Sequence, residues 1–130
     1  MNIIFSNTIF FLQKKGGISR YFVNLVRELK KIKVKCKIIA PISKNLYLKS
    51  FQQDQISFYV SRFPNNYLIK KINDLLFSWL LRKENPDIIH ETYYNRSNLN
   101  ILKNKIKVLT IYDLVHESFS KFYPKKKLLE

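Results

Sequence analysis

The hydrophobic pattern of this chain switches repeatedly between short apolar runs and helical periodicity. Apolar residues recur at positions 18, 21, 22, 25, 26, 29 and 32, which is the spacing of a helix with one apolar face. Residues 66–84 return to this period, and Asn85-Pro86 ends the second helix because the residue before proline avoids helical backbone angles. Pro41 is expected to end the second strand, and residues 42–55 to be irregular. Short apolar or alternating segments predict strands at residues 2–5, 34–40, 56–60, 87–90 and 108–111.

Strands that are separated by helices predict βαβ units and a parallel sheet. The segments around Ile4, Ile89 and Val108 are continuously apolar, which is typical of strands covered on both faces. We therefore expect one α/β domain over residues 1–130, a Rossmann-like open parallel sheet with helices on both faces. Ligands of such sheets bind at the carboxyl ends of the strands.

The chain is strongly basic, with 24 lysine and arginine residues against nine acidic ones and a formal net charge of +15. The abundance of Lys, Asn, Ile, Phe and Tyr, which all have A/T-rich codons, explains this balance by codon bias alone. Two further uses stay open, namely contact with an anionic membrane or charged substrate, and nucleic-acid binding. Nucleic acid is the less favoured partner, because lysines outnumber arginines 19 to 5 and are dispersed along the chain.

The content of cysteine and histidine limits the possible chemistry. One cysteine excludes a disulfide scaffold and suits a reducing compartment, and Cys36 is expected to be a small core residue. No zinc-type spacing is present, so no metal is expected. No apolar run reaches the ~18 residues of a spanning helix, and the start of the chain does not resemble a signal peptide. We expect a cytoplasmic protein.

The chain's two glycines, Gly16 and Gly17, are adjacent and lie where an expected loop over residues 6–17 meets a helix. Such a pair indicates positive φ angles or the close approach of a ligand. The start of the helix offers free N–H groups and the positive end of a dipole, which suit a phosphate or carboxylate. A tight turn without a ligand is the alternative. Neither the dinucleotide fingerprint nor the Walker pattern is present.

Polar and titratable residues follow two of the predicted strands. His90 ends the fourth strand, and Asp113, His116 and Glu117 follow the fifth. These side chains are expected at the same sheet edge as Gly16, where a histidine with nearby carboxylates can act as acid, base or partner of a sugar hydroxyl. A hydrogen-bonded structural histidine is the alternative for either position.

Three segments of the chain stand out together: GGISRYFVNLVREL (16–29), NPDIIHETYYN (85–95) and VLTIYDLVHESF (108–119). In this order and spacing they resemble the amino-terminal domain of family 4 glycosyltransferases, which are retaining GT-B enzymes. The resemblance runs from Met1 to Glu130. It implies an enzyme of cell-surface polysaccharide synthesis that transfers a sugar from a nucleotide sugar to a glycan or lipid-linked acceptor, with no further cofactor.

The resemblance also implies roles for particular residues. Gly16 and Gly17 match the glycine loop that approaches the donor diphosphate, and Arg20 and His90 fall on the donor- and acceptor-binding side. Tyr112 stands where the family commonly has a histidine that contacts the transferred sugar. The catalytic candidates that follow from this match are Tyr112, Asp113, His116 and Glu117.

The resemblance covers only the acceptor-side half of such an enzyme. We expect a truncated amino-terminal domain without the donor-binding domain, inactive alone, because transfer needs donor and acceptor held together. A disrupted gene, a split enzyme completed by a partner chain, and a fragment of a longer frame are the three explanations. A small basic nucleic-acid-binding module and a non-functional remnant are the competing interpretations.

The helix expected over residues 66–84 combines an apolar side with Lys70, Lys71, Arg82 and Lys83. A basic amphipathic helix can lie on an anionic membrane, and the resemblance would place it at the inner face of the cytoplasmic membrane. The favoured expectation is a core helix whose apolar side packs on the sheet. That side comprises Leu68, Ile69, Ile72, Leu75, Leu76, Trp79 and Leu80.

Overall fold

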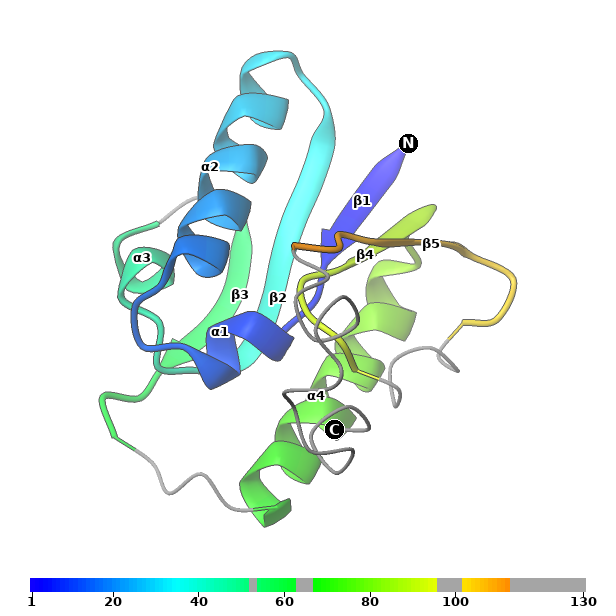
Figure 1. The fold of residues 1–130 in the computed structure, drawn as a ribbon. Coiled ribbons are helices and arrows are strands. Elements are labelled where there is room, and N and C mark those ends of the chain that lie inside the picture. The colour runs from blue at the N-terminus through cyan, green and yellow to red at the C-terminus, as the bar shows by residue number, and fades with distance from the viewer. Residues whose placement is uncertain (52–53, 63–66, 96–101, 113–130) are drawn as a thin grey trace, which may run out of the picture.

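A computed structural model describes residues 1–51, 54–62, 67–95 and 102–112 of the chain. It contains a five-stranded sheet in the order β3-β2-β1-β4-β5, in which every neighbouring pair is parallel (Figure 1). This confirms the predicted α/β, Rossmann-like sheet. The strands are β1 (Asn2–Phe5), β2 (Lys35–Ser43), β3 (Gln55–Tyr59), β4 (Ile88–Glu91) and β5 (Ile106–Leu109). The helices are α1 (Thr8–Leu12), α2 (Gly17–Lys31), α3 (Leu46–Ser50) and α4 (Tyr67–Glu84).

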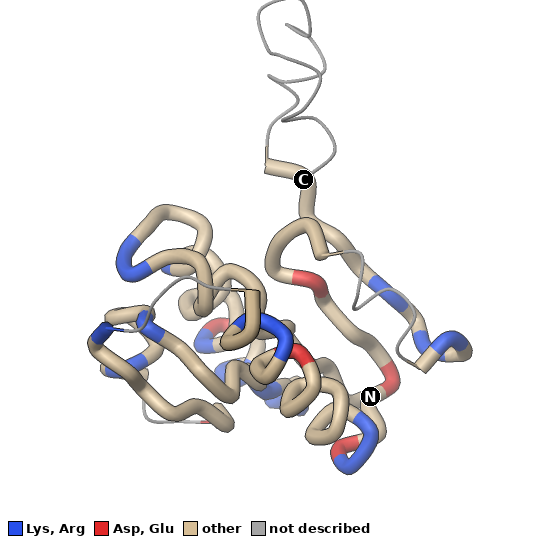
Figure 2. The backbone as a smooth tube through the Cα atoms, turned by 90° about the horizontal axis from the view of Figure 1, so that it is seen from below, with Lys and Arg blue, Asp and Glu red and all other residues tan. Residues whose placement is uncertain are grey.

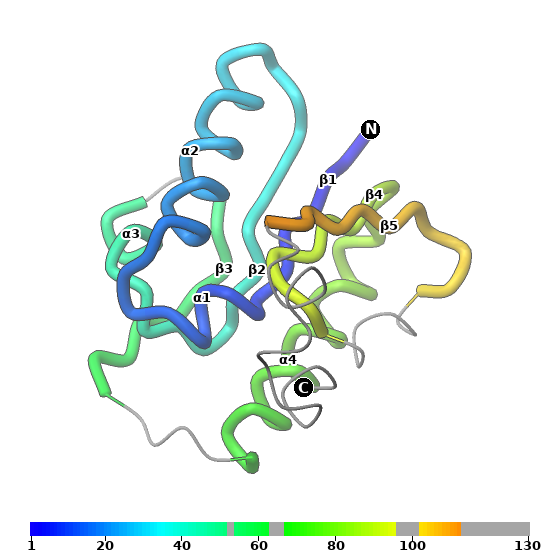
Figure 3. The backbone as a smooth tube through the Cα atoms, in the orientation of Figure 1, coloured from blue at the N-terminus to red at the C-terminus, as the bar shows by residue number. Residues whose placement is uncertain are grey.

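Two apolar layers cover opposite faces of the sheet, because successive strand residues point to opposite sides. Phe5 belongs to a cluster with residues of α1, α2 and α3, whereas its neighbour Ile4 packs with Phe77 and Leu81 of α4. Burial of each such side chain contributes about 1.5–3 kcal/mol. The tube view shows α2 and α4 on either side of the strands (Figure 3). Helices on both faces were predicted, and the described residues confirm them.

Two short helices replace segments that were expected to be irregular. The expected loop over 6–17 contains α1, which buries Ile9, Phe10 and Phe11, and the segment 42–55 contains α3. Both predictions of irregular structure were therefore wrong. In α3 the Asn45 side chain caps the helix, since its Oδ1 accepts hydrogen bonds from two backbone N–H groups at 3.1 Å.

The second strand does not end at Pro41 as expected but continues to Ser43. The pairing of β2 with β3 shifts register between Ala40 and Ile42, so the proline lies within an irregularity that does not need its missing N–H. The displaced N–H of Ile42 donates to Asn73 Oδ1 of α4 at 2.8 Å. An asparagine is thereby drawn to the buried side of that helix.

The face of α4 that packs on the sheet differs from the predicted one. Its buried residues are Asn73, Phe77 and Leu81. Most of the predicted core side is exposed to solvent, including Leu75 at 61% and Trp79 at 60%. Apolar residues cover more than half of the helix circumference, but only one part of this apolar surface packs against the sheet.

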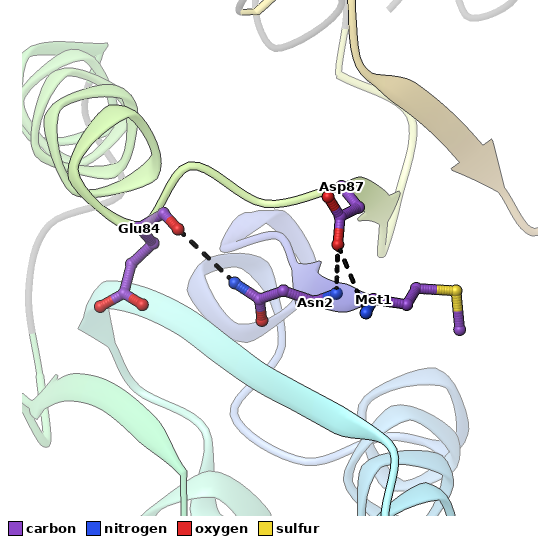
Figure 4. A network of polar contacts seen from close by, with 4 residues as sticks. All are labelled: Met1, Asn2, Glu84 and Asp87. Atoms are coloured by element: carbon purple, nitrogen blue, oxygen red, sulfur yellow. Dashed lines mark hydrogen bonds and ion pairs between the residues drawn. The ribbon is translucent and has the colours of Figure 1, made fainter.

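A small polar network connects residues at the amino ends of β1 and β4 (Figure 4). Asp87 Oδ2 accepts a hydrogen bond from the backbone N–H of Asn2 at 2.6 Å and lies 3.7 Å from the amino group of Met1. The Asn2 side chain donates to the Glu84 carbonyl at 3.5 Å. The bond from Asn2 lowers the pKa of Asp87, with the nearby amino group adding to the effect. These contacts fasten β1 to the turn between α4 and β4.

Candidate functional site

The carboxyl ends of the parallel strands carry a row of polar residues. Ser6 follows β1, Ser43 ends β2, Thr92 follows β4 and Thr110 follows β5. The register places His90 beside Phe5 and beside Val108, so the ends of β1, β4 and β5 lie level with one another. This edge is where ligands of open α/β sheets bind.

His90 is held by packing on two sides and a hydrogen bond on a third. Its ring stacks on Phe5 with centroids 5.1 Å apart and meets the edge of Phe22 at 5.3 Å. Its Nε2 lies 2.8 Å from Oγ1 of Thr110, which directly follows the neighbouring strand β5. Burial lowers the pKa of His90 from its usual 6.5, so the neutral form is favoured. A neutral imidazole can accept a proton as a base, or donate one hydrogen bond and accept another as the partner of a hydroxyl.

Tyr112 reaches the same edge from the chain segment that follows β5. Its hydroxyl donates to the Thr92 carbonyl at 3.4 Å, and its ring meets Tyr21 and Phe22 of α2 at 6.3 and 6.1 Å. Burial raises the pKa of Tyr112 well above its usual value, and Tyr21 adds to the rise. The phenol therefore stays protonated and acts as a hydrogen-bond donor.

A buried hydroxyl cluster joins the turn after β1 to the end of β4. Thr92 Oγ1 donates to the Ser6 carbonyl at 3.1 Å and accepts from the N–H of Ile9 at 3.1 Å. The Thr92 N–H donates in turn to Ser6 Oγ at 3.0 Å. Buried polar groups that are mutually satisfied in this way fix the geometry around them. The cluster sets the position of α1 relative to β4 at the base of the site.

The two glycines lie at the start of α2, on the same edge. Gly16 has φ −178°, which is ordinary extended backbone, and neither glycine has positive φ, so that part of the prediction was wrong. A methyl group on Gly16 would come 2.3 Å from Gln13 Oε1, whereas one on Gly17 would meet no atom within 4 Å. Within the described residues no side chain caps α2, so its first N–H groups receive no side-chain acceptor from the cap position.

The structure brings some of the predicted site residues together. Tyr112 contacts Tyr21 and Phe22, which directly follow Arg20 in α2, and His90 contacts the same Phe22. Asp113, His116 and Glu117 lie outside the described residues. The residues that sequence reasoning missed are the hydroxyl partners Ser6, Thr92 and Thr110. The signal that could have found them is the polar residue at the end of each predicted strand.

Several other features bear on the range of possible functions. Among the residues described, no group of three His, Cys, Asp or Glu side chains could hold a metal ion. No helix in the described part of the chain is both long and apolar enough to cross a membrane. The described lysines and arginines are spread over many elements rather than gathered on one (Figure 2). No protein-family model, curated protein or solved structure matches this chain.

Stability is expected to depend on the ionisation of His90. Its pKa is lower in the folded protein than in the unfolded chain, so the unfolded chain binds the proton more tightly. The contribution to stability is therefore present above pH 6.5 and is lost as pH falls through the folded pKa. One proton limits the slope to about 1.4 kcal/mol per pH unit.

Urea unfolding of the parent chain and of His90→Asn between pH 5 and 8 measures this slope. The second histidine, His116, is present in both proteins, so its titration cancels in the difference. The parent is expected to lose more stability than the variant as pH falls. Parallel stability curves for the two proteins would contradict the assignment of a half-buried, neutral His90.

Proposed function

We propose that this chain is the acceptor-side Rossmann-like unit of a retaining, GT-B glycosyltransferase of the family 4 type. The supporting observation is one juxtaposition. The uncapped start of α2 at Gly16 and Gly17 opens at the same sheet edge as His90 and Tyr112. A helix start suits a diphosphate, and the two side chains suit sugar hydroxyls, so a nucleotide sugar is the ligand class that fits both.

Each part of this edge has a role in the proposed reaction. The first N–H groups of α2 and the helix dipole bind and stabilise the negative charge of the diphosphate, which grows as it departs. His90 and Tyr112 orient the sugar or the acceptor through hydrogen bonds. By the same resemblance, Asp113, His116 and Glu117 contribute to this wall of the site.

The proposed reaction requires a second protein unit on the other side of the substrate-binding cleft. GT-B chemistry depends on holding donor and acceptor together, and we propose that a donor-binding unit, on the same or another polypeptide, completes the cleft. The net charge of +15 increases the local concentration of anionic nucleotide sugars around this unit. The acceptor is a glycan or lipid-linked glycan, and the cytoplasm is the proposed compartment, in keeping with the single, unpaired Cys36.

Two substitutions at Gly17 test the diphosphate-binding part of the proposal. Gly17→Asp places a carboxylate at the first helical residue, where it stabilises α2 by about 0.3–1 kcal/mol and repels a phosphate. Gly17→Ala is the matched control, because a Cβ there meets no atom within 4 Å. Binding of a panel of nucleoside diphosphates is expected to weaken roughly tenfold or more in the aspartate variant, and to change little in the alanine variant.

Calorimetric or spectroscopic titration measures both affinities, and thermal melting verifies that both variants fold. Equal affinities of the two variants would place any diphosphate away from the start of α2. Absence of binding to every nucleoside diphosphate in the parent chain would remove the support for this half of the proposal.

A further inference from the structure

One side of α4 is apolar and faces solvent. The exposed residues of this side are Leu68, Ile72, Leu75, Leu76 and Trp79, each between 43% and 62% accessible. They recur at helical spacing of three and four, so they form one continuous stripe. From Leu68 to Trp79 the stripe extends about 17 Å along the axis, at 1.5 Å per residue.

The charges on the outer side of α4 all have the same sign. Lys71 and Arg82 lie along one border of the stripe, and Lys83 lies one turn beyond its end, with its Nζ 5.7 Å from the centre of the Trp79 ring. The two acidic residues of the helix are held inward by other elements. Asp74 accepts a hydrogen bond from Asn7 at 3.0 Å, and Glu84 pairs with Lys37 at 2.8 Å.

We propose that this face of α4 docks on an anionic lipid surface. The helix would lie in the plane of the interface with the stripe in the acyl boundary and the cations among the headgroups, which is the arrangement that such a pattern favours. Tryptophan prefers this boundary because its ring is apolar and its N–H can meet water. The inference does not depend on the proposed glycosyltransferase function.

Charge complementarity selects the lipid surface over a second copy of the chain. Two copies would bring together like charges, since each carries a net +15 and the cations beside each stripe lie along one border and at its end. An anionic leaflet attracts the same cations by about 1 kcal/mol each, which is roughly a fivefold gain in partitioning for each lysine or arginine. The surrounding basic surface adds attraction at longer range.

Trp79 is the chain's one tryptophan, so its emission reports on the stripe directly. The parent chain is titrated at low salt with vesicles of phosphatidylcholine containing 30% phosphatidylglycerol, and with vesicles of phosphatidylcholine alone. We expect a blue shift, protection from acrylamide and co-sedimentation with the anionic vesicles only. Added salt is expected to weaken this binding because it screens the cations.

Two double variants separate the contributions. Lys71→Gln with Arg82→Gln is expected to lower the partition coefficient roughly 25-fold, as two fivefold losses. Leu68→Gln with Leu75→Gln is expected to abolish the blue shift, and both pairs should fold because these side chains are exposed. The matched charge control is Lys14→Gln with Lys31→Gln, which removes exposed lysines from the α2 side of the sheet and should cost less than about threefold.

Three results would overturn the proposal. One is the absence of binding to anionic vesicles. Another is an equal loss in the control pair and the α4 pair, which would mean unspecific charge attraction. The third is a blue shift of Trp79 that follows protein concentration without vesicles, which would identify a second copy as the occupant. Circular dichroism of each variant confirms that the comparison is between folded proteins.

Discussion

Replacing Phe22 with alanine is expected to lower the free energy of unfolding by about 3–5 kcal/mol. Phe22 is fully buried and lies between the sheet and the candidate site, with its ring 5.8 Å from Phe5, 5.3 Å from His90 and 6.1 Å from Tyr112. Its removal leaves a cavity and also takes away the wall against which both site rings rest. Thermal unfolding should show a midpoint lower by on the order of 10–20 °C.

The matched control for this substitution is Ile32→Ala at the end of the same helix. Ile32 is 70% exposed, so its truncation is expected to change stability by no more than about 0.5 kcal/mol. A similar small loss for Phe22→Ala would contradict the packing described for α2. The site rings should respond as well, with the NMR signals of His90 shifting in the Phe22 variant and not in the control.

Replacing Thr92 with valine is expected to cost about 2–4 kcal/mol, although the two side chains have nearly the same shape. The valine removes the hydroxyl that donates to the Ser6 carbonyl and accepts from the N–H of Ile9, and it leaves both backbone groups buried without that partner. An unsatisfied buried group costs about 1–3 kcal/mol.

Thr92→Ser keeps the hydroxyl and loses only a methyl group, so about 1 kcal/mol is expected. Urea unfolding of the two variants gives the difference. If serine were as damaging as valine, methyl packing rather than hydrogen bonding would hold the turn after β1 against β4. Hydrogen exchange at Ile9 offers a local readout, because its amide should lose protection in the valine variant alone.

The sheet could be predicted because its signals are local. Runs such as Ile3-Ile4-Phe5 and the period of α2 are visible within a short window, and the observed strands start and end within three residues of the predicted positions. The five-residue α1 could not be found this way, because a period of 3.6 needs more than one turn to show. Its burial of Phe10 depends on contacts with distant β2 and α2.

The face of α4 that packs on the sheet could not be predicted from the helix sequence alone. A broad apolar arc says that a helix is amphipathic but not which part of the arc meets the sheet. The part that packs on the sheet contains Asn73, a polar residue that a hydropathy pattern predicts to be exposed to solvent. It turns inward because the register shift at Pro41 leaves the N–H of Ile42 to be satisfied, and this backbone event far along the chain is invisible in the pattern of the helix.

The sequence was enough to predict where the candidate site lies, but not which residues contact one another in it. Parallel topology puts the carboxyl ends of all strands on one edge, so His90 was expected near the start of α2, and Tyr112 was a candidate through the family resemblance. The pairing of His90 with Thr110 depends on the register of β4 against β5, which no local pattern specifies. The glycines were expected for their backbone freedom, whereas in the structure Gly17 leaves the first turn of the helix open and Gly16 leaves room for the Gln13 side chain.

A nucleotide sugar is expected to bind at the carboxyl ends of the strands of this sheet. The most direct test is an NMR titration of the isotope-labelled chain with nucleoside-diphosphate sugars, which reports where the ligand binds. We expect the largest shifts at the amides of Gly17 and Ile18, together with shifts of the rings of His90 and Tyr112. Shifts confined to other elements while these four residues stay unchanged, or no shifts at all, would contradict it.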